Sequence, residues 1–223
     1  MSRAIAVLIS GNGSNLQALI ESCALPDSAA RIVLVVSNRA DAYGLVRARE
    51  AGIPTAIVDH REFIDRFDFE SGIDRLLRQA GVELVCLAGF MRVLTPYFVD
   101  GWRDRTLNIH PSLLPAFPGL HTHARALDAG VRLAGCTVHL VRSEVDTGPI
   151  ILQAAVPVLD EDDAQTLAAR VLEVEHQAYP RALQLFARGD LVVEGERIRP
   201  ADPQAPPARL LLHPLLQRQG KAG

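Results

Sequence analysis

Four short apolar runs, spread over the first 88 residues, constrain this chain more than any other feature. They occupy residues 4–9, 31–37, 53–59 and 82–88, and segments of helical periodicity lie between them. Runs that are apolar at most positions are typical of strands buried on both faces of a parallel sheet. Their alternation with helices through short links predicts an α/β fold, with a doubly wound, mostly parallel sheet flanked by helices.

Glycines and prolines mark the limits of the other predicted elements. Gly52 and Gly81 each follow a helical segment, where a left-handed glycine commonly ends a helix. Further strands are expected at residues 106–110, 136–141 and 150–158, with a hairpin at 191–198. A long helix is predicted from residue 162 to 187, and Pro180 should kink or interrupt it.

The length of the chain fits a single domain followed by a tail. A chain of 223 residues with 48% hydrophobic content is enough for one large α/β domain and barely for two small ones. We therefore expect one domain over residues 1–199. The tail, residues 200–223, holds five of the fourteen prolines. Its composition predicts a surface-draped or disordered end, with a partner-binding peptide as the alternative.

Charge and cysteine usage exclude several classes of protein. A net charge of −3 gives no basic footprint for a nucleic acid or an anionic membrane. Cys23, Cys86 and Cys136 are odd in number and far apart, which argues against a disulfide framework and suits a reducing compartment. No apolar run has the length of a signal peptide or a membrane span. We expect a soluble, cytoplasmic protein.

A glycine-rich loop follows the first predicted strand and leads into a helix. It reads Gly11-Asn12-Gly13-Ser14-Asn15. Glycine lets the backbone approach an anion closely, and a helix N-terminus offers unpaired N–H groups. No Gly-Lys-Ser/Thr follows, and Leu16 stands where a dinucleotide fingerprint has its third glycine. The loop therefore indicates a single phosphate monoester, or else a tight turn that merely needs glycine.

A polar pair lies at the end of the predicted strand at 106–110. Asn108 and His110 are two residues apart, so their side chains point to the same face. Pro111 then ends the strand, because it has no N–H to donate. An amide and an imidazole delivered together at a strand end could perform catalysis, but such a pair can also be merely hydrogen-bonded.

A second polar loop, residues 145–148, contains Asp146. An aspartate in such a turn most often bonds backbone amides. If it lay beside His110, however, its carboxylate would favour the charged imidazolium. His121, His123 and His139 lack the spacing of a metal site, and we expect His121 and His123 at a helix start instead. No metal is expected.

Taken together these blocks closely resemble the formyltransferases, and among them the folate-dependent glycinamide ribonucleotide transformylases. The likeness covers roughly residues 4–190. It is carried by Leu8–Gln17, Leu87–Arg92, Leu107–His123 and Asp146–Leu152. The run Asn-Ile-His-Pro-Ser-Leu-Leu-Pro is shared with the wider group, and its continuation Ala116–His123 points to the transformylases. The resemblance implies the Rossmann-like formyltransferase fold.

The resemblance also implies a reaction. The formyl group of 10-formyltetrahydrofolate, a co-substrate, would pass directly to the primary amine of glycinamide ribonucleotide, a step of de novo purine (IMP) biosynthesis. No metal would be needed. The partners would be small molecules, with no nucleic acid and no membrane, and we expect a monomer or a weak homodimer.

By the same likeness, site residues are assigned to three roles. The catalytic residues would be Asn108, His110 and Asp146. In the N-terminal half, Gly13, Ser14 and Asn15 would hold the ribonucleotide phosphate, and Glu175 would contact the ribose or amine end of the same substrate. The C-terminal half would be folate-binding and catalytic. The residues that contact the folate would be Arg66, Met91, Arg92, Val93, Leu94, Asn108, Arg142, Ser143, Glu144, Val145 and Asp146.

Other functions with the same core remain as alternatives. Methionyl-tRNA formyltransferase carries an added C-terminal nucleic-acid-binding domain, for which this chain has neither the length nor the charge. Formyltetrahydrofolate hydrolase carries an added N-terminal regulatory domain, whereas this chain begins directly with its first strand. Hydrolysis would use the same three residues and stays open. A non-catalytic nucleotide-binding module is disfavoured by the joint presence of Asn108, His110 and Asp146.

Overall fold

The computed structural model describes residues 2–204 and 209–217. The strands are β1 Arg3–Ile9, β2 Ala30–Ser37, β3 Thr55–Ile57, β4 Leu84–Leu87, β5 Thr106–His110, β6 Leu133–Leu140, β7 Ile150–Pro157, β8 Leu191–Glu194, β9 Arg197–Pro200 and β10 Leu210–Leu212. The helices are α1 Ser14–Cys23, α2 Gly44–Glu50, α3 Arg66–Gln79, α4 Pro96–Gly101, α5 Thr122–Asp128, α6 Ala164–Arg188 and α7 Pro214–Gln217, with a 3-10 turn at His60–Glu62.

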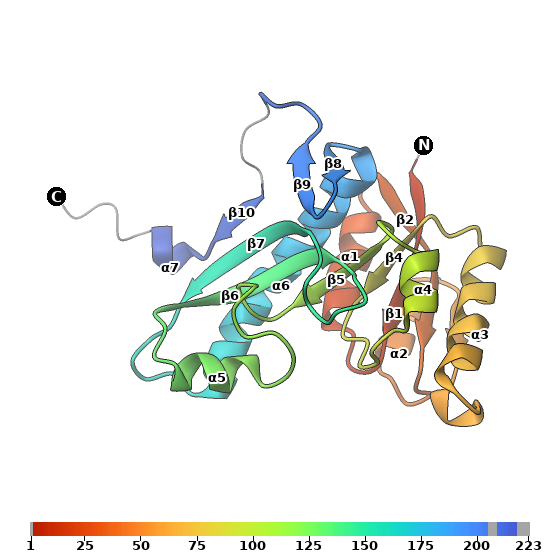
Figure 1. Ribbon diagram of the computed structural model, residues 1–223, viewed down its shortest axis with the longest axis horizontal. Helices are drawn as coiled ribbons and strands as arrows, with labels where there is room; N and C mark the ends of the chain where they lie inside the picture. The colour runs from red at the N-terminus through yellow and green to blue at the C-terminus, as the bar shows by residue number, and fades with distance from the viewer. Residues whose placement is uncertain (1, 205–208, 218–223) are drawn as a thin grey trace.

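One large sheet organises these elements, in the order β10-β7-β6-β5-β4-β1-β2-β3 (Figure 1). Its strands pair in parallel except where β6 runs antiparallel to both β5 and β7. The strands β8 and β9 form the predicted hairpin beside it. The prediction of a mostly parallel, doubly wound sheet is therefore confirmed.

Alternate residues of β1 show why helices must cover both faces of the sheet. Ile5, Val7 and Ile9 belong to the apolar cluster that α1, α2 and α6 complete on one face. Ala6 and Leu8 belong to the cluster on the other face, where α3 and α4 pack. A strand with no polar side cannot face water, so an apolar run such as this one requires two helical layers.

The long helix α6 departs from one expectation. It runs from Ala164 to Arg188 without interruption, although Pro180 lies inside it. A proline costs a helix one backbone hydrogen bond. Here the turns on either side are anchored by buried residues such as Ala178, Tyr179 and Leu183. Packing against the sheet therefore keeps the helix continuous, and the predicted interruption is wrong.

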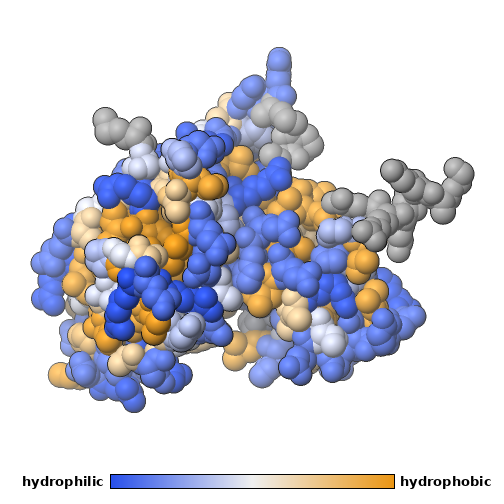
Figure 2. Space-filling model, turned by 180° about the vertical axis from the view of Figure 1, so that it is seen from behind, coloured by the Kyte–Doolittle hydropathy of each residue, from blue (hydrophilic) through white to orange (hydrophobic). Residues whose placement is uncertain are grey.

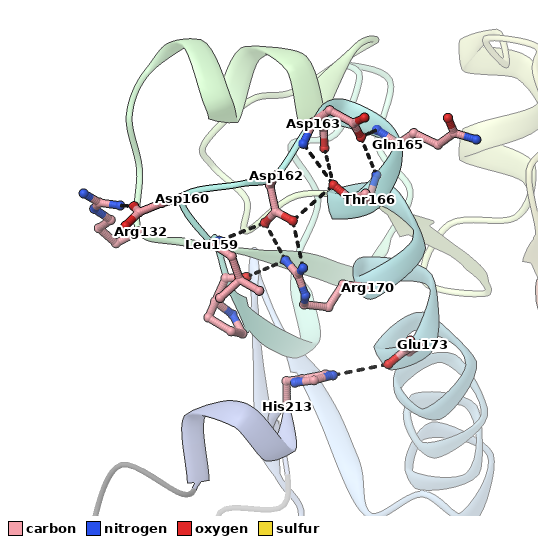
Figure 3. Close-up of polar contacts among 11 residues, drawn as sticks. Arg132, Leu159, Asp160, Asp162, Asp163, Gln165, Thr166, Arg170, Glu173 and His213 are labelled. Carbon is pink, nitrogen blue, oxygen red and sulfur yellow. Dashed lines mark hydrogen bonds and ion pairs between the residues drawn. The ribbon is translucent and has the colours of Figure 1, made fainter.

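The start of α6 is fixed by side chains (Figure 3). Asp163 accepts from the N–H groups of Gln165 and Thr166 and forms a capping box with Thr166. Asp162 accepts from both terminal nitrogens of Arg170, at 2.6 and 2.8 Å. The hydrogen bonds from Arg170 lower the pKa of Asp162 to about 2. The bonds to Asp163 satisfy N–H groups that a helix start leaves unpaired, and the ion pair of Asp162 with Arg170 ties the first turns together.

Part of the tail adds a strand to the sheet, which the proline-rich composition did not predict. The N–H of Gln153 in β7 donates to the carbonyl of Arg209 at 3.1 Å, and the N–H of His213 donates to the carbonyl of Ala155 at 2.9 Å. The side chain of His213 also lies 3.2 Å from the carboxylate of Glu173 on α6 (Figure 3). Residues 205–208 and 218–223 of the expected tail lie outside the described residues.

The surface alternates between hydrophobic patches and hydrophilic side chains on the side opposite to Figure 1 (Figure 2). Among the described residues, no helix is both long enough and apolar enough to cross a membrane. Cys23, Cys86 and Cys136 are free thiols, and burial raises the pKa of Cys23 to about 11.

Candidate active site

The polar residues singled out in the sequence gather at the carboxyl ends of three adjacent strands. Asn108 in β5 pairs with Leu87 in β4, and Leu87 in turn pairs with Leu8 in β1. Neighbouring strands lie about 4.8 Å apart, so Asn108 is roughly 10 Å across the sheet from the end of β1. Open α/β sheets bind their ligands at this edge.

His110 and Asp146 form a buried ion pair. The Nδ1 atom of His110 lies 3.2 Å from Oδ2 of Asp146, and both side chains are less than a tenth exposed. Asp146 adopts a left-handed backbone conformation, with φ of 58°, and also accepts from the N–H of Gly119 at 2.8 Å. The turn thus bonds a backbone amide, as its composition predicts, and also brings the carboxylate to the imidazole.

Both nitrogens of His110 face atoms that can only accept. Nδ1 faces the carboxylate of Asp146, and Nε2 lies 3.0 Å from the carbonyl oxygen of Phe117. A neutral imidazole has one N–H and could satisfy only one of these contacts. Only the doubly protonated form could donate to both, and in that form the ring would be both a proton source and a local positive charge.

Asn108 is oriented by a histidine from the neighbouring antiparallel strand. His139 in β6 is the register partner of Asn108, and its Nε2 lies 3.1 Å from Nδ2 of Asn108. Nδ1 of His139 lies 2.9 Å from the carbonyl of Leu140, so Nδ1 carries the proton and Nε2 accepts from the amide. Burial lowers the pKa of His139, which keeps it in this neutral form. The second amide hydrogen of Asn108 remains available.

The loop after His110 is held by two side chains of the antiparallel strands. Thr137 donates to the carbonyl of Ser112 at 2.7 Å and accepts from the N–H of Leu114 at 3.0 Å. Gln153 donates to the carbonyl of Leu114 at 2.9 Å. The peptide bond between Leu114 and Pro115 is cis. These contacts fix the path of the loop that carries the Phe117 carbonyl over His110.

The glycine-rich loop is shaped by close backbone contact with the start of α2. Gly13 has φ of 75°, and a Cβ atom on it would lie 2.7 Å from Cα of Gly44. The N–H of Gly44 donates to the carbonyl of Gly11 at 3.1 Å. Arg47 donates to both the carbonyl and the side-chain oxygen of Asn12, each at 3.0 Å. The loop therefore keeps its shape through backbone contacts and one arginine.

Asn15 and Glu175 lie in contact, although 160 positions separate them. The amide Nδ2 of Asn15 donates to Oε2 of Glu175 at 2.7 Å. Oδ1 of Asn15 is buried and has no hydrogen-bond partner among the described residues. Burial raises the pKa of Glu175 to about 6, and the hydrogen bond from Asn15 opposes that rise. Glu173, two residues earlier in α6, is exposed.

A cavity of about 420 Å³ connects the glycine-rich loop with the segment after β4. It is lined by residues Ser10 to Asn15 and by Asn38, Arg39, His60, Ala88, Gly89, Met91 and Arg92. Two groups of predicted binding residues thus share one hollow. The lining combines polar residues of the loop with the exposed, apolar Met91, and it does not include Asn108, His110 or Asp146.

The remaining residues assigned to the folate differ in their surroundings. Arg66 donates to the carbonyl of Val93 at 2.6 Å, which ties it to the segment Met91–Leu94. The guanidinium of Arg142 is instead bonded to Asp104 and Glu196, both at 2.8 Å, so its charge is already paired. Ser143, Glu144 and Val145 are exposed. From this loop, only Asp146 brings a side chain to His110.

Sequence reasoning considered His139 only as a metal ligand. Its position opposite Asn108 depends on the antiparallel pairing of β5 with β6. The spacing of residues along the chain does not predict that pairing. A polar residue at an alternating position of a predicted strand was the only available signal. His121 is the N-cap of α5 and His123 lies in its first turn, so the expectation that both stand at a helix start is confirmed.

Comparison with known proteins gives one consistent group of relatives. A family model described as formyl transferase matches residues 3–183. The chain is 56% identical over 189 residues to the trifunctional purine biosynthetic protein adenosine-3 of Gallus gallus, an alignment that covers 85% of this chain and 19% of that protein. This chain thus spans less than a fifth of the length of the trifunctional relative.

Relatives of similar length match almost from end to end. The phosphoribosylglycinamide formyltransferase of Escherichia coli (strain K12) is 46% identical over 207 residues, which cover 88% of this chain and 96% of that protein. The crystal structure of glycinamide ribonucleotide transformylase 1 from Symbiobacterium toebii has a TM-score of 0.88 and 50% identity, over 90% of this chain and 95% of that chain. Sequence identity and backbone similarity thus point to the same group of relatives.

Proposed function

This chain belongs to the formyl transferase family, and we propose that it transfers the formyl group of 10-formyltetrahydrofolate to the primary amine of glycinamide ribonucleotide. The step belongs to purine biosynthesis, and relatives of matching length carry the name of this activity. The observation that carries the proposal is the buried pair of His110 and Asp146 beside the oriented amide of Asn108.

In the proposed reaction the amine nitrogen attacks the formyl carbon and forms a tetrahedral intermediate with negative charge on oxygen. Asn108 donates its free amide hydrogen to that oxygen, and the imidazolium of His110 donates a second hydrogen bond and lends its charge. The attacking amine then loses a proton and N10 of the folate gains one, as the bond between carbon and N10 breaks. The imidazolium of His110 gives a proton to N10 as that bond breaks, the neutral ring then takes the proton that the amine loses, and Asp146 keeps the ring oriented throughout.

His110 must exchange one partner for this chemistry. Its Nε2 atom is bonded to the carbonyl of Phe117 at 3.0 Å, while Nδ1 is engaged by Asp146. We propose that the formyl oxygen takes the place of the Phe117 carbonyl when both substrates are bound. The pair with Asp146 stays intact during that exchange, so the imidazolium is ready before the substrate arrives.

The two substrates would occupy the two sides of the cavity. The ribonucleotide phosphate binds the N–H groups and side chains of Gly13, Ser14 and Asn15, and Glu175 accepts from the ribose or amine end. The pterin-like ring lies against Met91–Leu94 on one side and against the backbone of Arg142–Asp146 on the other. Arg66 supports the first of these segments through Val93.

We further propose that no metal takes part, since the charge on the intermediate is met by His110 and Asn108. The three free cysteines suit a reducing cytoplasm. A monomer or a weak homodimer is proposed, with residues 1–199 acting as one formyltransferase domain. Its N-terminal half would hold the ribonucleotide and its C-terminal half the folate.

A spectrophotometric assay for deformylated folate tests the function. The purified protein is given 10-formyltetrahydrofolate with and without glycinamide ribonucleotide, and the formylated ribonucleotide is identified by mass spectrometry. Product that depends on the ribonucleotide supports transfer. Product formed equally without it means hydrolysis, and no product in either case favours a binding module.

A further inference from the structure

We propose that Ser10 is a positioning residue that sets the ribonucleotide side and the folate side of the cavity in register with each other. Ser10 lies directly after β1, at the head of the glycine-rich loop, and is buried. Its hydroxyl accepts from the N–H of Met91 at 2.8 Å and donates to Oδ1 of Asn38 at 2.6 Å. This inference rests on the proposed function of the same cavity.

The direction of these hydrogen bonds is fixed by chemistry. The N–H of Met91 can only donate, so the hydroxyl of Ser10 must accept there. The single hydroxyl proton then goes to Asn38, whose side-chain oxygen can only accept. The three groups therefore form a chain with one possible polarity, unlike a surface serine, whose proton can rotate among several partners.

The position of this chain links two segments that belong to different substrates. Gly11 follows Ser10 in the sequence and opens the loop that is proposed to hold the phosphate. Met91 opens the segment that is proposed to hold the pterin-like ring. The N–H of Ser10 also donates to the carbonyl of Gly89, at 3.2 Å. Ser10 thus joins the ends of β1 and β4 by its backbone and by its side chain.

The relative position of the two sides of the cavity should affect the rate of formyl transfer more than the affinity for either substrate. Each substrate is held mainly by its own loop, so either can bind even if the other side shifts. Reaction requires the amine nitrogen and the formyl carbon to meet at near-bonding distance, and a misplacement of about 1 Å can cost as much as a hundredfold in rate. Removal of the hydroxyl leaves the buried N–H of Met91 and Oδ1 of Asn38 without this partner, so we expect the segment at Met91 to relax.

Steady-state kinetics of Ser10→Ala test the proposal. We expect kcat to fall by about tenfold or more, while KM for each substrate stays within about threefold. Ser10→Thr keeps the hydroxyl and should restore most of the rate. Ser37→Ala is the matched control, since Ser37 is a buried serine at the end of the neighbouring strand β2. Within the described part of the chain its hydroxyl bonds its own turn, at Arg39. The kcat of this control should be unchanged.

Two outcomes would overturn the assignment. An equal change of kcat in Ser10→Ala and Ser37→Ala would reduce Ser10 to a purely structural role. A rise in KM for one substrate with unchanged kcat would make Ser10 part of a single binding site. If Ser10→Ala fails to fold, Asn38→Leu removes the acceptor instead, and a normal kcat in that variant contradicts the proposal.

Hydrogen–deuterium exchange gives a reading that does not depend on turnover. Inorganic phosphate is added to occupy the glycine-rich loop, and exchange is followed in the peptide that contains Met91. We expect phosphate to slow exchange there in the wild type and to have no such effect in Ser10→Ala. Equal slowing in both proteins would refute the coupling of the two sides through Ser10. Absence of formyl transfer by the wild type would refute only the proposed function.

Discussion

The two halves of the site are built in different ways. In the N-terminal half, the glycine-rich loop takes its shape from backbone contacts with α2, where Gly13 meets Gly44 and the carbonyl of Gly11 accepts from the N–H of Gly44. In the C-terminal half, side chains of β5, of β6 and of the loop after β6 orient one another, with His139 bonded to Asn108 and Asp146 paired with His110. Binding of the ribonucleotide thus depends on backbone conformation, whereas the transfer step depends on particular side-chain atoms.

This difference determines which substitutions should matter. A side chain of the loop can be shortened while the N–H groups that meet a phosphate stay in place. A side chain of the catalytic half cannot be shortened without removing the donor itself. Apart from Ser10, which joins the two sides, we therefore expect losses of turnover from the C-terminal half and losses of affinity from the N-terminal half. The four predictions below test this division.

The largest effect is expected for His110→Ala. Loss of the imidazolium removes a donor to the intermediate and the proton carrier, so kcat should fall roughly a hundredfold or more. Binding of tetrahydrofolate, measured by fluorescence titration, should remain near the wild-type value. Near-normal turnover in this variant would show that His110 takes no part in the mechanism. It would also contradict the division into a binding half and a catalytic half.

Gly44→Ala should damage the N-terminal half through its backbone. The added Cβ would lie 2.5 Å from Cδ1 of Ile9 and 3.3 Å from Cα of Gly13, so the loop must shift. Overpacking of this kind costs about 2 kcal/mol of folding stability, which urea unfolding measures. The displaced loop should also raise KM for the ribonucleotide. Gly101→Ala in α4, where the new atom meets only the end of Arg78 at 4.0 Å, is the control.

Replacement of both Ser14 and Asn15 by alanine should have a smaller effect on the same half. The side-chain donors are lost but the backbone N–H groups remain, so ribonucleotide affinity should fall about tenfold. Isothermal titration calorimetry with each substrate separates the two sides of the cavity. A change confined to folate affinity would show that the phosphate is held elsewhere.

Glu175→Gln should change stability more than transfer, because glutamine keeps an oxygen that can accept from Asn15. Burial raises the pKa of Glu175 from 4.5 to about 6. The folded state therefore binds the proton more tightly, and stability falls as pH rises from 4.5 through 6. The variant lacks this decline, so urea unfolding at pH 7.5 should find it about 2 kcal/mol more stable than the wild type. The same decline in both proteins would contradict this account.

Much of the fold follows from local pattern. The run at residues 4–9 had no polar face, and the structure gives β1 over Arg3–Ile9 with helices on both sides. The alternation that places Asn108 and His110 on one face needs only a strand. Both features depend on neighbours in the sequence, which is why pattern could predict them.

Other features depend on residues that meet only after folding. The pairing of Asn108 with His139 needs the register of an antiparallel strand, and β10 is a strand of only 3 residues whose partner lies more than 50 positions earlier. The local sequence of β5 does not predict its pairing with β6, and that of β10 does not predict its pairing with β7. The closeness of Asp146 to His110 was suggested by the resemblance, and their spacing of 36 residues alone could not have indicated it.

The strand β10 also decides when the sheet is complete. Because β10 fills the outermost place beside β7, that place stays empty until residue 212 has left the ribosome. A premature stop or a protease cut ahead of Arg209 would leave the N–H of Gln153 and the carbonyl of Ala155 open to the strand edge of another molecule. Truncated chains should therefore be prone to aggregation.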